Sequence, residues 1–317
     1  MKFLCLPGAY GNAKNFKVQL DPLAGELERR GLAEFVYSQG KHEVDAPKGW
    51  EDYFGAKPFY RFLDTTRGDT FETLRRLRHV PHSLNAEDTM RMFQGAGHGE
   101  DWHQKAWREA LDGVFQTLDE DPEIDALIGY SEGAMVGASL IVEEAARAER
   151  SGVPRRIKFA IFISGAPPLK FEGNDRIVAQ LFDEAGTVID IPTFHIFGCD
   201  DAFLSSAVAL YNVCEQEKAK MYDHGLGHIV PRDAENVGIL ADIFQDLLPK
   251  VDAANRKQAA AAAAHHKNNG GATAGQNGLR KQQLHHNQRL PVRTGSETDE
   301  GEATDVDFTS AMARPMC

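Results

Sequence analysis

The chain has 317 residues and a formal net charge of −12 at pH 7. This length suffices for one large domain with additional segments, and the acidic excess excludes a nucleic-acid binder because phosphates would be repelled. The N-terminal apolar stretch is too short for a secretory signal, and no apolar run has the length of a membrane span. The cysteines show no metal-ligand spacing, and buried thiols expected at Cys5 and Cys199 would fit a reducing compartment such as the cytoplasm.

Apolar runs and helical periodicities alternate along the chain up to about residue 250. Strands are predicted at 2–6, 34–37, 124–128, 157–163, 193–197 and 219–222. Helices are predicted at 15–30, 102–118, 132–151, 174–184, 206–217 and 233–248. Such alternation is typical of the α/β class, in which a mostly parallel sheet carries helices on both faces.

Two segments interrupt this pattern. Residues 42–99, called the insertion below, follow the second strand and are rich in Pro, Gly, Asp and aromatic residues. A stretch this long favours an inserted segment with helical pieces, and 70–78 and 86–93 have helical patterns. Its aromatic residues either pack on the sheet or line an apolar pocket. Residues 252–317 are of low complexity and are expected to be disordered, which leaves a domain at 1–251.

The sequence Gly129-Tyr130-Ser131-Glu132-Gly133 lies between a predicted buried strand and a predicted helix. A serine on such a sharp strand-to-helix turn has an exposed hydroxyl with the helix N-terminus behind it. Glycines flank the serine because larger side chains would collide with neighbouring backbone. The pattern predicts that Ser131 is a nucleophile.

A serine hydroxyl needs an imidazole to take its proton and a carboxylate to orient that imidazole. Asp201 follows a predicted strand at the sheet edge where parallel strands end, and His228 lies in a glycine-rich turn before the last helix. Their order along the chain, after Ser131, fits this type of site. Asp200 and His224 are the alternatives, and the spacing of the two turns favours Asp201 and His228.

The negative charge that develops on the substrate oxygen needs two backbone N–H donors. One is expected from Glu132, directly after the nucleophile, and the other from Ala9 or Tyr10 in the loop after the first strand. His195 lies within a strand and is expected to be a core histidine. Ser164 is expected to be a turn hydroxyl.

Taken together, these stretches resemble the fungal serine hydrolase family, which includes the ovarian-cancer-associated gene 2 type hydrolases and belongs to the α/β-hydrolase superfamily. The matching segments are 3–8 with Asn12, 129–134, 162–165, 193–198 with Asp201, and 224–231. The resemblance implies an α/β-hydrolase fold and esterase activity, in several members within fungal secondary-metabolite pathways that make polyketides. Two residues depart from the family pattern: Pro7 replaces a histidine, and Glu132 replaces a glutamine.

The expected reaction is acyl transfer from a small hydrophobic ester or a polyketide thioester to water through an acyl-serine, without cofactor or metal. An acyl carrier domain of a polyketide synthase is a possible partner, and Arg75, Arg76 and Arg78 would offer it a basic patch. The alternatives are a general carboxylesterase and a non-catalytic binding protein on a hydrolase scaffold. Pro7 and Glu132 are the residues that favour the non-catalytic alternative.

Overall fold

The computed structural model describes residues 1–46, 54–63, 84–95, 104–172 and 176–269. The chain divides into two compact units, Met1–Asn255 and Arg256–Cys317, and the first of these holds the sheet. The predicted helix at 70–78 and the part of the predicted disordered tail beyond 269 lie outside the described residues.

A six-stranded sheet with the order β10-β9-β6-β5-β1-β2 forms the centre of the first unit. Its strands are β1 (Lys2–Leu6), β2 (Glu34–Tyr37), β5 (Ala126–Tyr130), β6 (Phe159–Ile163), β9 (Thr193–Phe197) and β10 (Ala219–Asp223). Every neighbouring pair is parallel, so the prediction of a parallel sheet is confirmed. The strand order reverses between β1 and β5, and the loops at the carboxyl ends of such a pair form the usual ligand crevice of an open α/β sheet.

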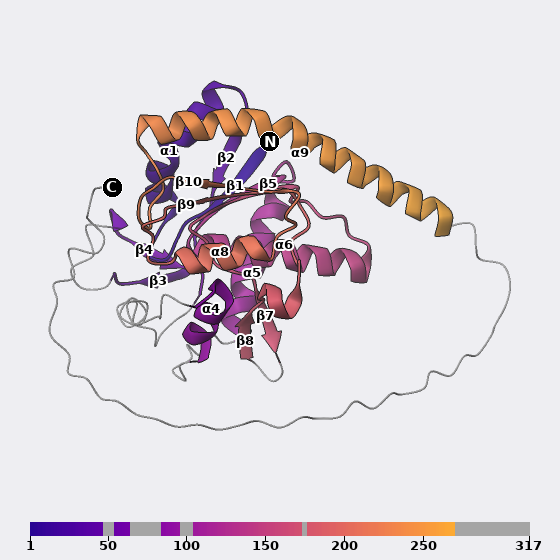
Figure 1. Cartoon of the computed structure of the whole chain (residues 1–317), viewed down its shortest axis with the longest axis horizontal. Helices are drawn as coiled ribbons and strands as arrows, with labels where there is room; N and C mark the ends of the chain where they lie inside the picture. The colour runs from indigo at the N-terminus through magenta and orange to yellow at the C-terminus, as the bar shows by residue number, and fades with distance from the viewer. Residues whose placement is uncertain (47–53, 64–83, 96–103, 173–175, 270–317) are drawn as a thin grey trace. The chain divides into compact units, whose positions relative to one another are not determined.

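Helices cover both faces of this sheet (Figure 1). One face carries α1 (Ala13–Arg29) and the part of α9 (Ala234–Asn269) up to Val251, and the other carries α5 (Gln104–Glu120), α6 (Glu132–Ser151) and α8 (Leu204–Asn212). Side chains of a strand point alternately to the two faces, so Phe3 and Cys5 join the core under α1 and α9, whereas Leu4 and Leu6 join the other core. This explains why the strands read as continuous apolar runs.

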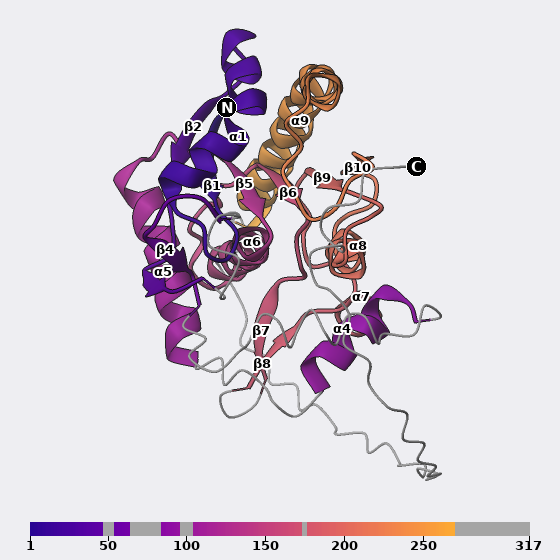
Figure 2. The same cartoon turned by 90° about the vertical axis from the view of Figure 1, so that its left-hand side faces the viewer.

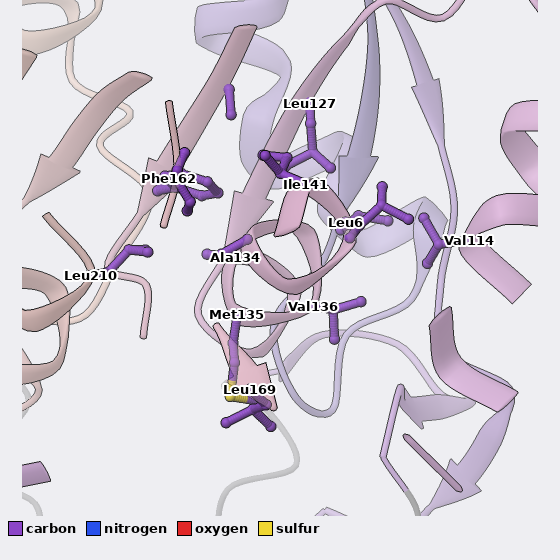
Figure 3. Packing of buried hydrophobic residues seen from close by; sticks show 14 of the residues in the cluster. Leu6, Val114, Leu127, Ala134, Met135, Val136, Ile141, Phe162, Leu169 and Leu210 are labelled. Carbon is purple, nitrogen blue, oxygen red and sulfur yellow. The ribbon is translucent and has the colours of Figure 1, made fainter. Parts of the chain in front are cut away.

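Helix α6 lies very close to the sheet because glycine and alanine occupy several of its buried positions, among them Gly133, Ala134 and Gly137. Figure 3 shows Ala134 and Val136 of α6 among Leu6, Leu127 and Phe162 of the strands. A Cβ atom added at Gly137 would lie 2.5 Å from a methyl carbon of Leu127. This close packing fixes the start of α6, and with it the turn that precedes the helix.

The described part of the insertion contains an antiparallel pair, β3 (His42–Val44) and β4 (Phe59–Arg61), and the helix α4 (Ala86–Gly95). The helix confirms the prediction at 86–93, whereas the strand pair was not expected. Helix α4 lies against α8 (Figure 2), where the Asn212 side-chain amide donates to Glu87 at 2.8 Å and the Ser206 hydroxyl donates to the Met90 sulfur at 3.2 Å.

The predicted helix at 174–184 is wrong for most of its length. An antiparallel pair occupies this region, β7 (Leu169–Glu172) with β8 (Arg176–Ala179), and only a short helix, α7 (Phe182–Ala185), follows. Ile177 and Val178 are β-branched and favour an extended backbone, and they pair with Phe171 and Lys170. Tertiary pairing thus outweighs the weak helical spacing.

The last helix also differs from the prediction. Helix α9 does not end at Leu248 but continues to Asn269, so it includes residues 252–269 of the predicted tail. Alanine has the highest helix propensity of any residue type, and the alanines at 259–264 favour the continuation of the helix beyond Pro249. Within the described ranges, none of the helices has both the length and the apolar character that a bilayer span requires.

Candidate active site

Ser131 lies on a tight turn between β5 and α6. Its backbone has a φ of 52° and a ψ of −116°, a conformation that side chains other than glycine rarely adopt. The Ser131 N–H donates to the Ile163 carbonyl at 2.9 Å, which holds the turn against β6. A Cβ atom added at Gly129 would lie 2.4 Å from Ala134 Cα, and one at Gly133 would lie 2.2 Å from the Leu6 carbonyl oxygen. The turn therefore requires both glycines of the motif.

Three side chains that are distant in the sequence meet at this turn. The His228 Nε2 atom lies 3.0 Å from the Ser131 hydroxyl oxygen. On its other side, His228 Nδ1 lies 2.9 Å and 3.1 Å from the two carboxylate oxygens of Asp201. A serine, an imidazole and a carboxylate in this order form the arrangement that activates a hydroxyl for nucleophilic attack.

The carboxylate that contacts His228 belongs to Asp201 and not to Asp200. The Asp201 side chain is fully buried, whereas Asp200 is exposed. Burial by itself raises the pKa of Asp201. The hydrogen bond and charge of His228 and the Phe203 N–H, which donates at 2.7 Å, outweigh this effect, so the pKa lies below its usual value. Asp201 is therefore a carboxylate at neutral pH.

His224 is buried beside this site and does not contact Ser131 in the described structure. Burial lowers the pKa of His224, and its Nδ1 atom accepts the Leu226 N–H at 3.3 Å. The neighbouring Asp223 carboxylate accepts the N–H groups of Cys199 and Gly225 at 2.9 and 2.8 Å, which connects the loop after β9 to the loop after β10. His224 and Asp223 thus stabilise the two loops that contain Asp201 and His228.

The loop after β1 contacts the nucleophile directly. A Cβ atom added at Gly8 would lie 3.2 Å from Ser131 Cβ. The Gly11 N–H donates to the Gly8 carbonyl at 3.0 Å, and this turn places Tyr10 at a φ of 62°. Ala9 and Tyr10 therefore lie in the turn next to Ser131, and the Glu132 N–H belongs to the first turn of α6, where N–H groups have no partner within the helix.

The sequence matches the family described as serine hydrolase (FSH1) over residues 1–239. The chain belongs to the FSH1 serine hydrolase family. The match includes all three side chains of the site and most of the first compact unit.

Named relatives of this FSH1 serine hydrolase occur in fungi and animals. Hydrolase phiM of Talaromyces stipitatus is 26% identical over 252 residues, which cover 78% of this chain and 87% of phiM. Esterase FPY3 of Fusarium mangiferae is 27% identical over 254 residues, which cover 79% of this chain and 98% of FPY3. Esterase OVCA2 of Homo sapiens is 25% identical over 237 residues, which cover 74% of this chain and 91% of OVCA2.

Two aromatic residues of this serine hydrolase hold the His228 ring in place, and sequence reasoning missed both. The ring centroids of Phe203 and Tyr130 lie 4.9 and 5.3 Å from that of His228. The Tyr130 hydroxyl also donates to the His228 carbonyl oxygen at 2.8 Å. A tyrosine directly before the nucleophile was the available signal, but its partner lies 98 positions away in the sequence.

The remaining expectations of site residues have mixed outcomes. His195 is buried in β9, with Nε2 3.0 Å from the Thr193 hydroxyl, as expected of a core histidine. Ser164 is buried at a φ of 45°, directly after the end of β6. Cys199 is exposed rather than buried, because the chain has already left β9 there, whereas Cys5 is buried.

The buried His195 should make the stability of the FSH1 hydrolase depend on pH. Burial lowers the pKa of His195 to about 3, whereas in the unfolded chain the group takes up a proton near pH 6.5. The unfolded state therefore binds more protons between these values, and stability falls as the pH decreases. From pH 7.5 to pH 5, His195 alone should lower the free energy of unfolding by about 2 kcal/mol.

This contribution can be measured by urea unfolding of the wild type and of His195→Gln at both pH values. The wild type should lose about 2 kcal/mol more than the variant over this range, because glutamine does not titrate. An equal loss in the two proteins would show that His195 is not the group responsible.

Proposed function

We propose that this protein is a serine esterase that hydrolyses carboxylic esters or thioesters through an acyl-serine intermediate. The proposal rests chiefly on the continuous series of contacts from Ser131 through His228 to Asp201. The names of the relatives phiM, FPY3 and OVCA2, two of which are called esterases, support the same class of reaction.

In the proposed first step, the Ser131 oxygen attacks the carbonyl carbon while His228 Nε2 takes the hydroxyl proton. The Asp201 carboxylate fixes the His228 tautomer and stabilises the imidazolium. The Glu132 N–H and an N–H of the Ala9–Tyr10 turn are the proposed donors to the oxyanion. His228 then passes its proton to the leaving oxygen or sulfur, which leaves an acyl-serine.

In the second step, water attacks the acyl-serine as His228 takes a proton from it. The second oxyanion collapses, the Ser131 oxygen leaves with that proton, and the carboxylic acid is released. His228, Asp201 and the oxyanion donors have the same roles in both steps, whereas Ser131 is the nucleophile in the first step and the leaving group in the second.

The proposed substrates are small or medium hydrophobic esters, or acyl thioesters held on a carrier domain. Apolar groups next to Ser131, His228 and Asp201 support this class. Phe203 lies over the His228 ring, and Leu226, in the same loop as His228, is 39% exposed. A role in polyketide metabolism follows from the family resemblance, and a cytoplasmic location fits the buried thiols of Cys5 and Cys214. The arginines proposed for carrier docking (75, 76 and 78) lie outside the described residues.

A fluorophosphonate probe tests this function, because it reacts only with an activated serine. The wild type should be labelled at Ser131, Ser131→Ala should lose the label completely, and Ser151→Ala, at the exposed far end of α6, should keep it. Absence of label in the wild type would favour a non-catalytic binding protein instead. A panel of p-nitrophenyl esters and acyl thioesters then separates esterase from thioesterase activity.

A further inference from the structure

The side chain of Glu132 leaves the nucleophile turn and ends at the insertion. It is 5% exposed, and one of its oxygens accepts the N–H groups of Phe62 and Leu63 at 2.7 and 3.1 Å. The other oxygen accepts the Arg61 Nε–H at 2.9 Å. The carboxylate thus joins the residue after the nucleophile to the end of β4, 71 positions earlier in the chain.

The Arg61 guanidinium also contacts the loop after β1. Its central carbon lies 5.7 Å from the centroid of the Tyr10 ring, within the range of a cation–π interaction. The Tyr10 ring also contacts Phe54, with ring centroids 4.8 Å apart. Arg61 therefore contacts the side chains of Glu132 and Tyr10, two residues whose backbone segments are proposed to bind the oxyanion.

Other contacts fix the same loop to the insertion. The Asn12 side-chain amide donates to the carbonyl oxygens of Ala56 and Pro58 at 3.2 and 2.8 Å, and Gly11 forms a bridge with Tyr60. The loop therefore has a backbone-level connection to β4 in addition to Arg61. The loop can remain folded when Arg61 is replaced, which makes the role of its charge measurable.

The charge of Glu132 creates an electrostatic conflict that Arg61 resolves. A carboxylate on the residue that donates to the oxyanion opposes the negative charge of the transition state. Its backbone and guanidinium partners stabilise it away from the reacting atoms, and loss of the cation would leave a buried negative charge uncompensated. The effect should fall on the transition state more than on the bound ester, since only the transition state is anionic.

We propose that Arg61 is a positioning residue for the oxyanion hole. It orients Glu132 and Tyr10 and compensates the charge of Glu132, while the insertion supplies it from outside the central sheet. This inference rests on the proposed esterase function and assigns a reason to the unusual glutamate after the nucleophile.

The test compares Arg61→Met, Glu132→Gln and the double variant in hydrolysis of a p-nitrophenyl ester. Arg61→Met should lower kcat by about 10- to 100-fold and change KM by less than about threefold, because the charge conflict acts on the transition state. The double variant should regain about tenfold in kcat over Arg61→Met, since glutamine removes the uncompensated charge yet still accepts the two backbone N–H groups.

A matched control is Arg147→Met. Arg147 also pairs with a glutamate of α6, Glu143 at 2.9 Å, and also lies over an aromatic ring, that of Phe115 at 3.7 Å, but it is 41% exposed and far along the helix from Ser131. Its replacement should leave kcat unchanged. Binding of an arylboronic acid, whose serine adduct is anionic, should weaken in Arg61→Met by about the same factor as kcat falls.

The outcomes separate this inference from the esterase proposal. If the wild type hydrolyses esters but the double variant is no faster than Arg61→Met, or if Arg61→Met keeps full kcat, the positioning role is refuted. If the wild type is neither labelled by a fluorophosphonate nor active, the esterase proposal itself fails. Should Arg61→Met not fold, Arg61→Lys keeps the charge without the planar group and should retain more kcat than the neutral Arg61→Gln.

Discussion

Asp201→Asn should lower kcat/KM for an ester substrate by about 10⁴-fold, whereas Asp200→Asn should change it by less than about twofold. Asp201 is buried and accepts the His228 Nδ1–H, so an amide in its place no longer stabilises the imidazolium and favours the wrong tautomer. Asp200 is the neighbouring residue with the same side chain, but it is exposed and makes no comparable contact with the histidine in the described structure.

The two variants form a matched pair for steady-state kinetics. The Asp201→Asn protein should melt close to the wild-type temperature, because asparagine can still accept the Phe203 N–H that Asp201 accepts at 2.7 Å. A loss of activity with an intact melting temperature therefore reports on the chemistry. Similar activities of the two variants, or a larger loss in Asp200→Asn, would show that Asp201 is not the carboxylate that orients His228.

Gly133→Ala should destabilise the protein by about 3 kcal/mol or more and abolish most activity. A Cβ atom at this position would lie 2.2 Å from the Leu6 carbonyl oxygen and 2.4 Å from that of Pro7, both of which are backbone atoms that cannot rotate away. The first turn of α6 would have to move away from β1. That movement would shift both the nucleophile and the N–H group behind it.

Gly238→Ala is the control for this glycine. Gly238 lies in α9 with no atom within 4 Å of an added Cβ, so alanine should stabilise the helix by about 0.5–1 kcal/mol. Thermal unfolding of the two variants should therefore shift in opposite directions from the wild type. A Gly133→Ala protein that melts at the wild-type temperature would contradict the close approach of α6 to β1.

Much of the site was predictable because its residues follow strands. Ser131, Asp201 and His228 each follow the end of a strand, and parallel strands bring their carboxyl ends to one edge, so order and spacing sufficed to predict that these three side chains lie together. Local pattern is informative there because the strands are buried on both faces and read as plain apolar runs.

The features that sequence reasoning missed depend on contacts between distant segments. The pairing of Glu132 with Arg61 joins a helix start to an inserted strand, and neither residue has a local pattern that predicts the other. Strand β8 lies within the range that was predicted as a helix, 174–184, because its stability comes from pairing with β7 rather than from a periodic pattern.

The position of β1 in the sheet has a consequence for folding. Its inner neighbour is β5, and the Lys2 N–H reaches the Asp125 carboxylate across 123 positions of chain. During synthesis from the N-terminus, β1 therefore cannot pair with β5 until more than a third of the polypeptide has been synthesised. Contacts of such long sequence separation slow folding, and the apolar edge of β1 is exposed to aggregation meanwhile. Expression at low temperature or with chaperones should accordingly raise the yield of folded enzyme.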